Sequence, residues 1–171
     1  DVLRATSAIC AGLSNGVKKV IPVASVEEAI EYRQKGFVVA AERKGKVVEG
    51  FDLGNSPSSW LNPDLIGETV VLTTTNGTQA IHTARRCQHM VMGSIINLGA
   101  VIKYLHEKNK NVMLLGSGWK NKFCLEDTIC AGAIAEGLLA TGEFRSEEDS
   151  TIASKYLYLS ARDNYLGYLK A

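Results

Sequence analysis

The chain has 171 residues, of which 46% are hydrophobic and 22% are charged, a composition that suits one globular core and excludes a disordered or fibrous protein. The 19 Lys and Arg residues nearly balance the 18 Asp and Glu residues, and no long block of like charge occurs. The sequence therefore gives no electrostatic support for a nucleic-acid or membrane-surface partner, and a small polar ligand is expected.

Hydrophobic segments in the sequence are short. The longest, Ala131–Ala140, is interrupted by Glu136 and Gly137, and no charged-then-apolar leader precedes the first segment. This pattern argues against a transmembrane span or a signal peptide. The four cysteines form no C-x-x-C pair and are expected to be reduced thiols, so we predict a cytoplasmic protein.

Strand and helix patterns alternate along the chain. In chain order they predict the end of a buried strand at Asp1–Leu3, a helix over Thr6–Leu13, a strand over Lys19–Val23, a helix over Ser25–Lys35, strands over Phe37–Glu42 and Val70–Thr75, a helix over Thr78–Arg86, a strand over Met90–Gly93, a helix over Asn97–Lys108, a strand over Asn111–Gly116, and helices over Leu125–Thr141 and Thr151–Lys170. This alternation predicts an α/β domain with a largely parallel sheet, in which ligands gather at the carboxyl ends of the strands.

The most informative segment is Val70–Ile81, where β-branched residues lead through Asn76-Gly77-Thr78 into a helical pattern. A helix N-terminus has free N–H groups and a partial positive charge, so it can hold a phosphate or a carboxylate. We expect Thr78 to be the N-cap and Gly77 to allow close approach of a ligand. The alternative is that these residues only form the turn and cap the helix.

A faint internal repeat is present. A shift of 72 positions lays Arg4-Ala5-Thr6 over Asn76-Gly77-Thr78, and Lys19–Val23 over Val91–Ile95. Two copies of one βαβα unit, at about residues 1–45 and 70–117, would explain this match, and chance similarity of two βα units is the alternative. A true duplication would give two equivalent helix N-termini that face one ligand.

Both ends of the chain look incomplete. A domain rarely begins with the last residues of a strand, and the closing helical pattern has no stop signal. We therefore expect one α/β unit over residues 1–171 that is truncated at both ends.

Charged residues occur where site residues are expected. Arg43 could bind an anion and Glu42 a cation, although a solvated turn is the commoner explanation for such a pair. Glu126 and Asp127 open a helix, where acidic residues stabilise the helix dipole. The alternative is that they bind Mg²⁺, with Asp1 as a third carboxylate.

Six motifs, in order through nearly the whole chain, resemble the 2-phosphosulfolactate phosphatase family. They are Asp1-Val2-Leu3-Arg4-Ala5-Thr6, Glu42-Arg43, Leu53-Gly54-Asn55-Ser56-Pro57, Thr73-Thr74-Thr75-Asn76-Gly77-Thr78, Gly93-Ser94 with Asn97, and Glu126-Asp127 with Ala131-Gly132. The resemblance implies an Mg²⁺-dependent phosphatase that removes phosphate from 2-phospho-3-sulfolactate, a step towards coenzyme M. It also implies a three-layer α/β/α fold with an internal duplication and further strands beyond both ends of this chain.

The resemblance assigns roles to particular residues. The expected catalytic residues are Asp1, Arg4 and Asp127, and the expected Mg²⁺ ligands are Asp1, Glu126 and Asp127. The expected substrate-binding residues are Arg4, Thr6, Arg43, Asn55, Ser56, Thr75, Asn76, Gly77, Thr78 and Asn97. In this hypothesis backbone N–H groups and threonine hydroxyls hold the phosphate, and the two arginines pair with sulfonate or carboxylate.

Lys44, Trp119–Lys122 and Cys124 depart from the family pattern and leave the substrate in doubt. The alternatives are a phosphatase for another small 2-phospho-organic acid and a non-catalytic anion-binding module. The expected partner is a small phosphorylated anion, with no nucleic acid and no membrane, and a homodimer is the oligomeric state considered.

Overall fold

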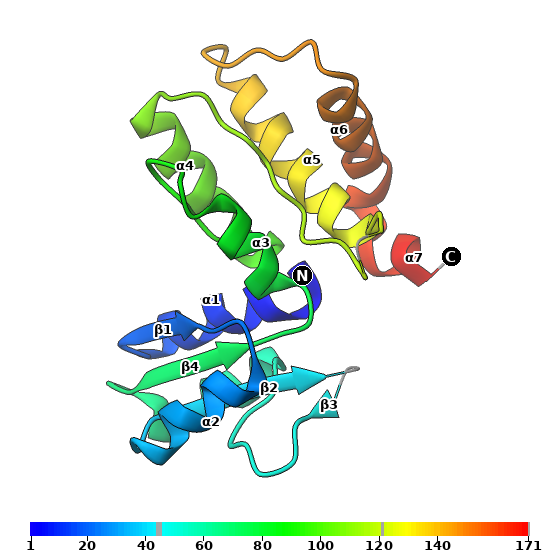
Figure 1. Cartoon of the computed structure of the whole chain (residues 1–171). Helices are drawn as coiled ribbons and strands as arrows, with labels where there is room; N and C mark the ends of the chain where they lie inside the picture. The colour runs from blue at the N-terminus through cyan, green and yellow to red at the C-terminus, as the bar shows by residue number, and fades with distance from the viewer. Residues whose placement is uncertain (44–45, 121, 171) are drawn as a thin grey trace. The chain divides into compact units, whose positions relative to one another are not determined.

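A computed structural model describes residues 1–43, 46–120 and 122–170. Lys44 and Gly45, in the turn expected after Arg43, lie outside the described residues, as does Asn121. The chain divides into two compact units, which are described separately. The sheet unit is Leu3–Met90, and the helical unit is Asp1–Val2 with Val91–Ala171 (Figure 1).

The sheet unit contains a mixed four-stranded sheet in the order β1-β4-β2-β3. Its strands are β1 (Lys19–Pro22), β2 (Val38–Arg43), β3 (Lys46–Val47) and β4 (Thr69–Thr73). The strand β4 pairs in parallel with both β1 and β2, whereas β3 is antiparallel to β2. The α/β prediction is confirmed, with the three predicted strands of this unit shifted by at most two residues at their ends.

Helices cover both faces of this sheet. The residues Val39 and Val71 pack beneath α2 (Val26–Gln34), in a cluster that includes Ala29. Their neighbours in sequence face the other way: Ala40 and Leu72 pack with α1 (Ser7–Asn15) and with Trp60 of the 3-10 turn Pro57–Leu61. Side chains alternate between the faces of a strand, so strands that are buried on both sides form the middle of an α/β/α arrangement. The three-layer prediction is confirmed within the sheet unit.

The start of α2 has the capping-box pattern, with Ser25 as the N-cap and Glu28 three residues later. The Ser25 hydroxyl accepts a hydrogen bond from the Glu28 N–H at 3.1 Å, and the Glu28 carboxylate accepts one from the Ala24 N–H at 3.1 Å. These reciprocal bonds satisfy two N–H groups that the helix itself cannot satisfy.

The strand predicted at Asp1–Leu3 is wrong. Instead Val2–Thr6 form a π-type turn, interrupted at Leu3 by non-helical dihedral angles, and α1 follows from Ser7. The Val2 N–H bonds to the Asp127 carboxylate at 3.1 Å, where a strand would bond to a neighbouring strand. The helix α1 ends at Gly16, whose φ of 104° is a left-handed conformation that favours glycine.

The helical unit contains α4 (Leu98–Lys108), α5 (Leu125–Ala140), α6 (Asp149–Ala161) and α7 (Tyr165–Lys170). The single helix predicted over residues 151–170 is wrong because a 3-10 turn, Arg162–Asn164, interrupts it. The Asn164 side chain accepts a hydrogen bond from the Gly167 N–H at 3.1 Å, which gives α7 its own start. No helix in the described part of the chain is long and apolar enough to cross a membrane.

The strands predicted over Met90–Gly93 and Asn111–Gly116 are also wrong for the described residues, which form no strand there. In the second segment Val112 and Leu114 pack against a core cluster that includes Ile134 of α5, while Met113 remains 85% exposed. The alternating pattern therefore reflects an extended segment with one face against helices. The proposed duplication stays a prediction.

Close packing of α5 against α6 depends on a glycine. A Cβ added at Gly132 would lie 1.9 Å from the Ser154 carbonyl oxygen, which belongs to the backbone of α6. Backbone atoms cannot move aside as a flexible side chain can, so even a methyl group would force the two helices apart.

We expect Gly132→Ala to destabilise the protein by about 3 kcal/mol, because overpacking a helix contact strains both helices. Urea unfolding followed by circular dichroism measures this change. The matched control is Gly99→Ala in α4, where an added Cβ meets nothing within 4 Å. Alanine there should have no effect or stabilise by up to about 1 kcal/mol. Equal stabilities of the two variants would contradict the close approach.

Candidate functional site

The connection from β4 to α3 (Gly77–Ala84) lies at the carboxyl edge of the sheet. The Thr74 hydroxyl accepts a hydrogen bond from the Gly77 N–H at 3.0 Å, and the Thr78 hydroxyl donates one to the Thr74 carbonyl at 3.2 Å. The N-cap position is occupied by Asn76, so the prediction of Thr78 as N-cap is wrong. Because Thr78 instead lies inside the first turn, its hydroxyl can reach back to the end of the strand.

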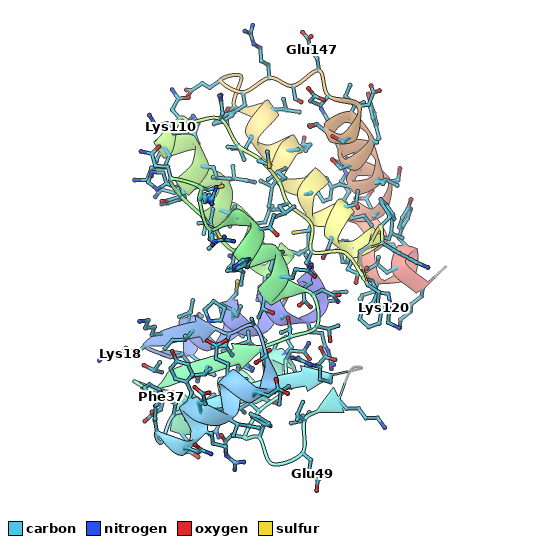
Figure 2. All side chains as sticks on the ribbon, in the orientation of Figure 1. Lys18, Phe37, Glu49, Lys110, Lys120 and Glu147 are labelled. Atoms are coloured by element: carbon cyan, nitrogen blue, oxygen red, sulfur yellow. The ribbon has the colours of Figure 1, made fainter. Side chains whose placement is uncertain are left out.

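The N-terminus of α1 lies at the same edge of the sheet. The far end of α1 is tied to the amino end of β4, since the Gly67 N–H bonds to the Gly16 carbonyl at 2.8 Å. The helix therefore runs antiparallel to the strands and begins, just after Thr6, at their carboxyl ends. Figure 2 shows Lys18 and Phe37 at the opposite, amino edge. Two helix N-termini, of α1 and α3, thus belong to this edge.

The side chain of Arg43, at the end of β2, is held on the α2 face of the sheet. Its guanidinium donates to the Glu42 carbonyl at 2.7 Å and to the Thr73 hydroxyl at 3.1 Å. The pKa of Glu27 is lowered by hydrogen bonds to its own backbone N–H and the Ser25 hydroxyl, with a further contribution from the charge of Arg43. Arg43 therefore contributes positive charge beside the start of α2.

The buried polar residues of the sheet unit are Ser7, Glu42, Asn55, Thr73 and Thr74. Asn55 was among the predicted substrate-binding residues, whereas sequence reasoning assigned no role to Thr74. The sequence feature that could have identified Thr74 is its position in a run of three threonines at the end of a strand. Ser56, also predicted, shares a 3.0 Å hydrogen bond with Ser58, and Arg4 and Thr75 are exposed.

In the helical unit, Asp127 accepts several hydrogen bonds. One carboxylate oxygen accepts from the backbone nitrogens of Asp1 and Val2. The other accepts from the Ser117 hydroxyl at 3.1 Å and from the Gly118 N–H at 2.9 Å. Asp127 therefore fastens the start of α5 to both the N-terminal residues and the 117–118 turn.

These contacts control the ionisation of Asp127, which is only 5% exposed. Burial would raise its pKa, but hydrogen bonds from the Asp1 nitrogen and from the N–H groups of Val2 and Gly118 lower the pKa below its usual value. The carboxylate is therefore ionised at neutral pH and fully engaged by donors.

Neutral groups surround the start of α5. Burial, followed by the nearby Glu126 and Asp127 carboxylates, raises the pKa of Cys124 to about 11. Burial and the Cys130 thiol, followed by the same carboxylates, raise the pKa of Tyr165 to about 12. The Tyr165 hydroxyl is buried and has no hydrogen-bond partner among the described residues. The thiol and the phenol thus stay protonated at neutral pH.

The Asn97 side chain stabilises the local backbone. Its amide oxygen accepts from the Ser94 N–H at 2.8 Å, and its amide nitrogen donates to the Met92 carbonyl at 2.9 Å. The Ser94 hydroxyl accepts in turn from the Ile96 N–H, which completes a capping arrangement before α4. A role for Asn97 in substrate binding stays a prediction.

No three His, Cys, Asp or Glu side chains within the described ranges gather into a group that could hold a metal ion. Asp1 meets Asp127 through its backbone nitrogen rather than through its carboxylate. The assignment of Mg²⁺ to Asp1, Glu126 and Asp127 therefore stays a prediction.

A family model described as 2-phosphosulpholactate phosphatase matches residues 1–171. The chain belongs to this family. The resemblance seen in the six sequence motifs is thereby confirmed, and the family name identifies a phosphatase, a phosphoric monoester hydrolase.

Relatives that carry the name "Probable 2-phosphosulfolactate phosphatase" occur in several bacteria. The protein from Caldanaerobacter subterraneus subsp. tengcongensis is 39% identical over 99% of this chain and 72% of its own length. The Thermotoga petrophila protein is 45% identical over 81% of this chain and 60% of its own length. The Synechocystis sp. protein is 38% identical over 99% of this chain and 73% of its own length. The chain thus spans between 60% and 73% of these three family members.

We expect Asp127→Asn to destabilise the protein by about 2 kcal/mol at pH 7, because buried donors lose a charged acceptor. Since folding lowers the pKa of Asp127, its contribution is present above the unfolded-state pKa of about 4 and is lost as the pH falls through the folded-state value. The difference from wild type should therefore shrink in acid. Urea unfolding from pH 7 to pH 3 measures it, with the exposed Asp163→Asn as control. A difference that does not change with pH would contradict this assignment.

The raised pKa of Cys124 predicts slow alkylation. At pH 8 a thiol with a pKa of about 11 is about 0.1% thiolate. Its alkylation rate should therefore increase about tenfold with each unit of increasing pH until the pH reaches that pKa. Mass spectrometry after iodoacetamide treatment measures this, with the exposed Cys87 as internal reference. A Cys124 rate that levels off below pH 9 would show that burial and the carboxylates do not hold the thiol neutral.

Proposed function

We propose that this protein hydrolyses 2-phosphosulfolactate to 3-sulfolactate and phosphate in the cytoplasm, with Mg²⁺, as a step towards coenzyme M. The observation that carries the proposal is the family match over the whole of residues 1–171. The printed names of relatives up to 45% identical support the same substrate.

The carboxyl edge of the sheet unit supplies the chemistry for binding phosphate. The N-termini of α1 and α3 present N–H groups and partial positive charge, which favour a phosphate without a lysine. The turn that would hold the transferred group contains the Thr78 hydroxyl and the N–H groups of Asn76 and Gly77. The Gly77 N–H and the Thr78 hydroxyl already donate to Thr74, so a phosphate there would have to replace those bonds. Donors fixed before the reaction stabilise charge that develops on the phosphoryl oxygens.

The arginines suit the other end of the substrate. A guanidinium offers parallel donors that match two oxygens of a sulfonate or carboxylate. Arg43 is pre-oriented by its bonds to the Glu42 carbonyl and the Thr73 hydroxyl, so ordering it costs little on binding. Arg4 is exposed, just before the start of α1. We assign Arg43 and Arg4 to recognition of these acidic groups.

When bound, Mg²⁺ neutralises phosphate charge and orients the phosphoryl oxygens. Oxygen ligands suit this ion, and the described residues offer carboxylates in both units: Glu126 and Asp127 in the helical unit, and Glu42 in the sheet unit. Both oxygens of Asp127 already accept hydrogen bonds, so a metal there would have to displace Val2, Ser117 or Gly118 as partners. Carboxylates of either unit are therefore candidate ligands for a divalent cation, although among the described residues no three acidic, histidine or cysteine side chains gather into one group.

A substrate panel tests this function. We expect phosphate release from 2-phosphosulfolactate in the presence of Mg²⁺, at least about tenfold faster than from 2-phospholactate, because the sulfonate gains the arginine contacts. EDTA should abolish the release, and added Mg²⁺ should restore it.

The other outcomes are informative. A preference for 2-phospholactate would assign another 2-phospho-organic acid. The absence of release from every member of the panel, with phosphate still raising the melting temperature, would instead indicate an anion-binding module.

A further inference from the structure

The start of α2 contributes a carboxylate to the carboxyl edge of the sheet. The chain leaves β1 at this edge, where the Val23 N–H bonds to the Leu72 carbonyl at 2.9 Å, and α2 begins at Val26. The first turn of α2 contains two acidic residues, Glu27 and Glu28. Glu28 closes the helix cap through the Ala24 N–H, whereas the exposed side chain of Glu27 has no role in the proposed function.

Glu27 and Arg43 are neighbours on one side of the sheet. Side chains alternate along β2, so Arg43 shares the face of Val39, which packs beneath α2. The Arg43 guanidinium also donates to Thr73, the last residue of β4. The pKa of Glu27 is lowered by hydrogen bonds to its own N–H and the Ser25 hydroxyl and, less strongly, by the charge of Arg43. The α2 side of the carboxyl edge therefore carries two opposite charges that interact.

The position of the Glu27 carboxylate is fixed by the helix cap. The Ser25 hydroxyl accepts a hydrogen bond from the Glu28 N–H at 3.1 Å and donates one to the Glu27 carboxylate. An exposed carboxylate without such a partner would turn freely into solvent. Because Ser25 ties it to the start of α2, the Glu27 carboxylate stays near Arg43.

An acidic ligand held by Arg43 meets both of these charges. The guanidinium attracts a sulfonate or a carboxylate, and the Glu27 carboxylate repels it. In solvent-exposed surroundings a charge several ångströms away changes affinity by about twofold for each unit of ligand charge. A ligand with two negative charges at its acidic end is thus weakened about fourfold, and a ligand with one charge about twofold.

A purely local role for Glu27 makes a different prediction. Acidic residues in a first turn stabilise the helix dipole, and this effect does not depend on which ligand is bound. Dependence on ligand charge therefore distinguishes an effect on binding from an effect on the helix.

We infer that Glu27 is a specificity-determining residue, which limits the advantage that a second acidic group of the ligand gains at Arg43. It does so by partly neutralising the guanidinium and by repelling the added charge. The inference rests on the proposed function for the assignment of Arg43 to the acidic end of the ligand. It concerns binding, so it can be measured without turnover.

The test is isothermal titration calorimetry with 2-phosphosulfolactate and 2-phospholactate in the presence of EDTA. The acidic end of the first ligand has a sulfonate and a carboxylate, and that of the second has a carboxylate alone. We expect Glu27→Gln to tighten binding of 2-phosphosulfolactate about fourfold and of 2-phospholactate about twofold. In 0.5 M NaCl both gains should fall below about 1.5-fold, because the Debye length is then about 4 Å.

The matched control is Glu31→Gln. Glu31 is an exposed carboxylate of the same helix, one turn further from the carboxyl edge, so this variant should bind both ligands as wild type does. Glu27→Lys extends the series because it reverses the charge. It should tighten binding of 2-phosphosulfolactate about 16-fold and of 2-phospholactate about fourfold.

Several results would overturn the inference. They are unchanged affinities in Glu27→Gln, equal gains for the two ligands, gains that persist in 0.5 M NaCl, the same gains in Glu31→Gln, and no binding of either ligand by the wild-type protein. The phosphatase assay is judged separately. Absence of phosphate release with Mg²⁺, from a protein that shows the expected affinity changes, would refute the proposed function and leave the role of Glu27 standing.

Discussion

The parallel pairing of β4 with β2 is the contact on which the rest of the sheet unit depends. It buries Val39 and Val71 on one face and Ala40 and Leu72 on the other, and so requires helices on both sides. The same register also determines where the polar side chains at the ends of these strands lie. Beyond the last apolar pair, Ala40 with Leu72, the strand β2 ends in Glu42 and Arg43, whose side chains lie on opposite faces. The positive charge of Arg43 lies on the α2 side, and the negative charge of Glu42 on the α1 side.

The carboxyl edge of the sheet therefore has positive charge on its α2 side and negative charge on its α1 side. A phosphorylated, sulfonated acid carries charge at both ends, and a site for it needs separate positive regions. Helix N-termini and guanidinium groups supply such regions directly, whereas a carboxylate supplies one only by recruiting a cation.

Local signals predicted local structure well. The Ser25 and Glu28 cap, the strand at residues 69–73 and the helix after Gly77 follow from patterns within a few residues. Sequence alone could not show that Asp127 would meet Val2, Ser117 and Gly118, because those contacts join distant segments. Alternation at residues 111–116 was mistaken for a strand, since packing one face against helices gives the same period as pairing in a sheet.

The hydrogen bond from the Trp60 indole to the Gly54 carbonyl gives the molecule a spectroscopic consequence. Trp60 is fully buried, whereas Trp119, the second of two tryptophans, is 49% exposed. Emission at shorter wavelengths should thus come from Trp60, whose ring is bonded to the residue that precedes Asn55. A change in the environment of Gly54 and Asn55 would change the intrinsic fluorescence of the protein. Trp60 is therefore a built-in fluorescent probe of this part of the sheet unit.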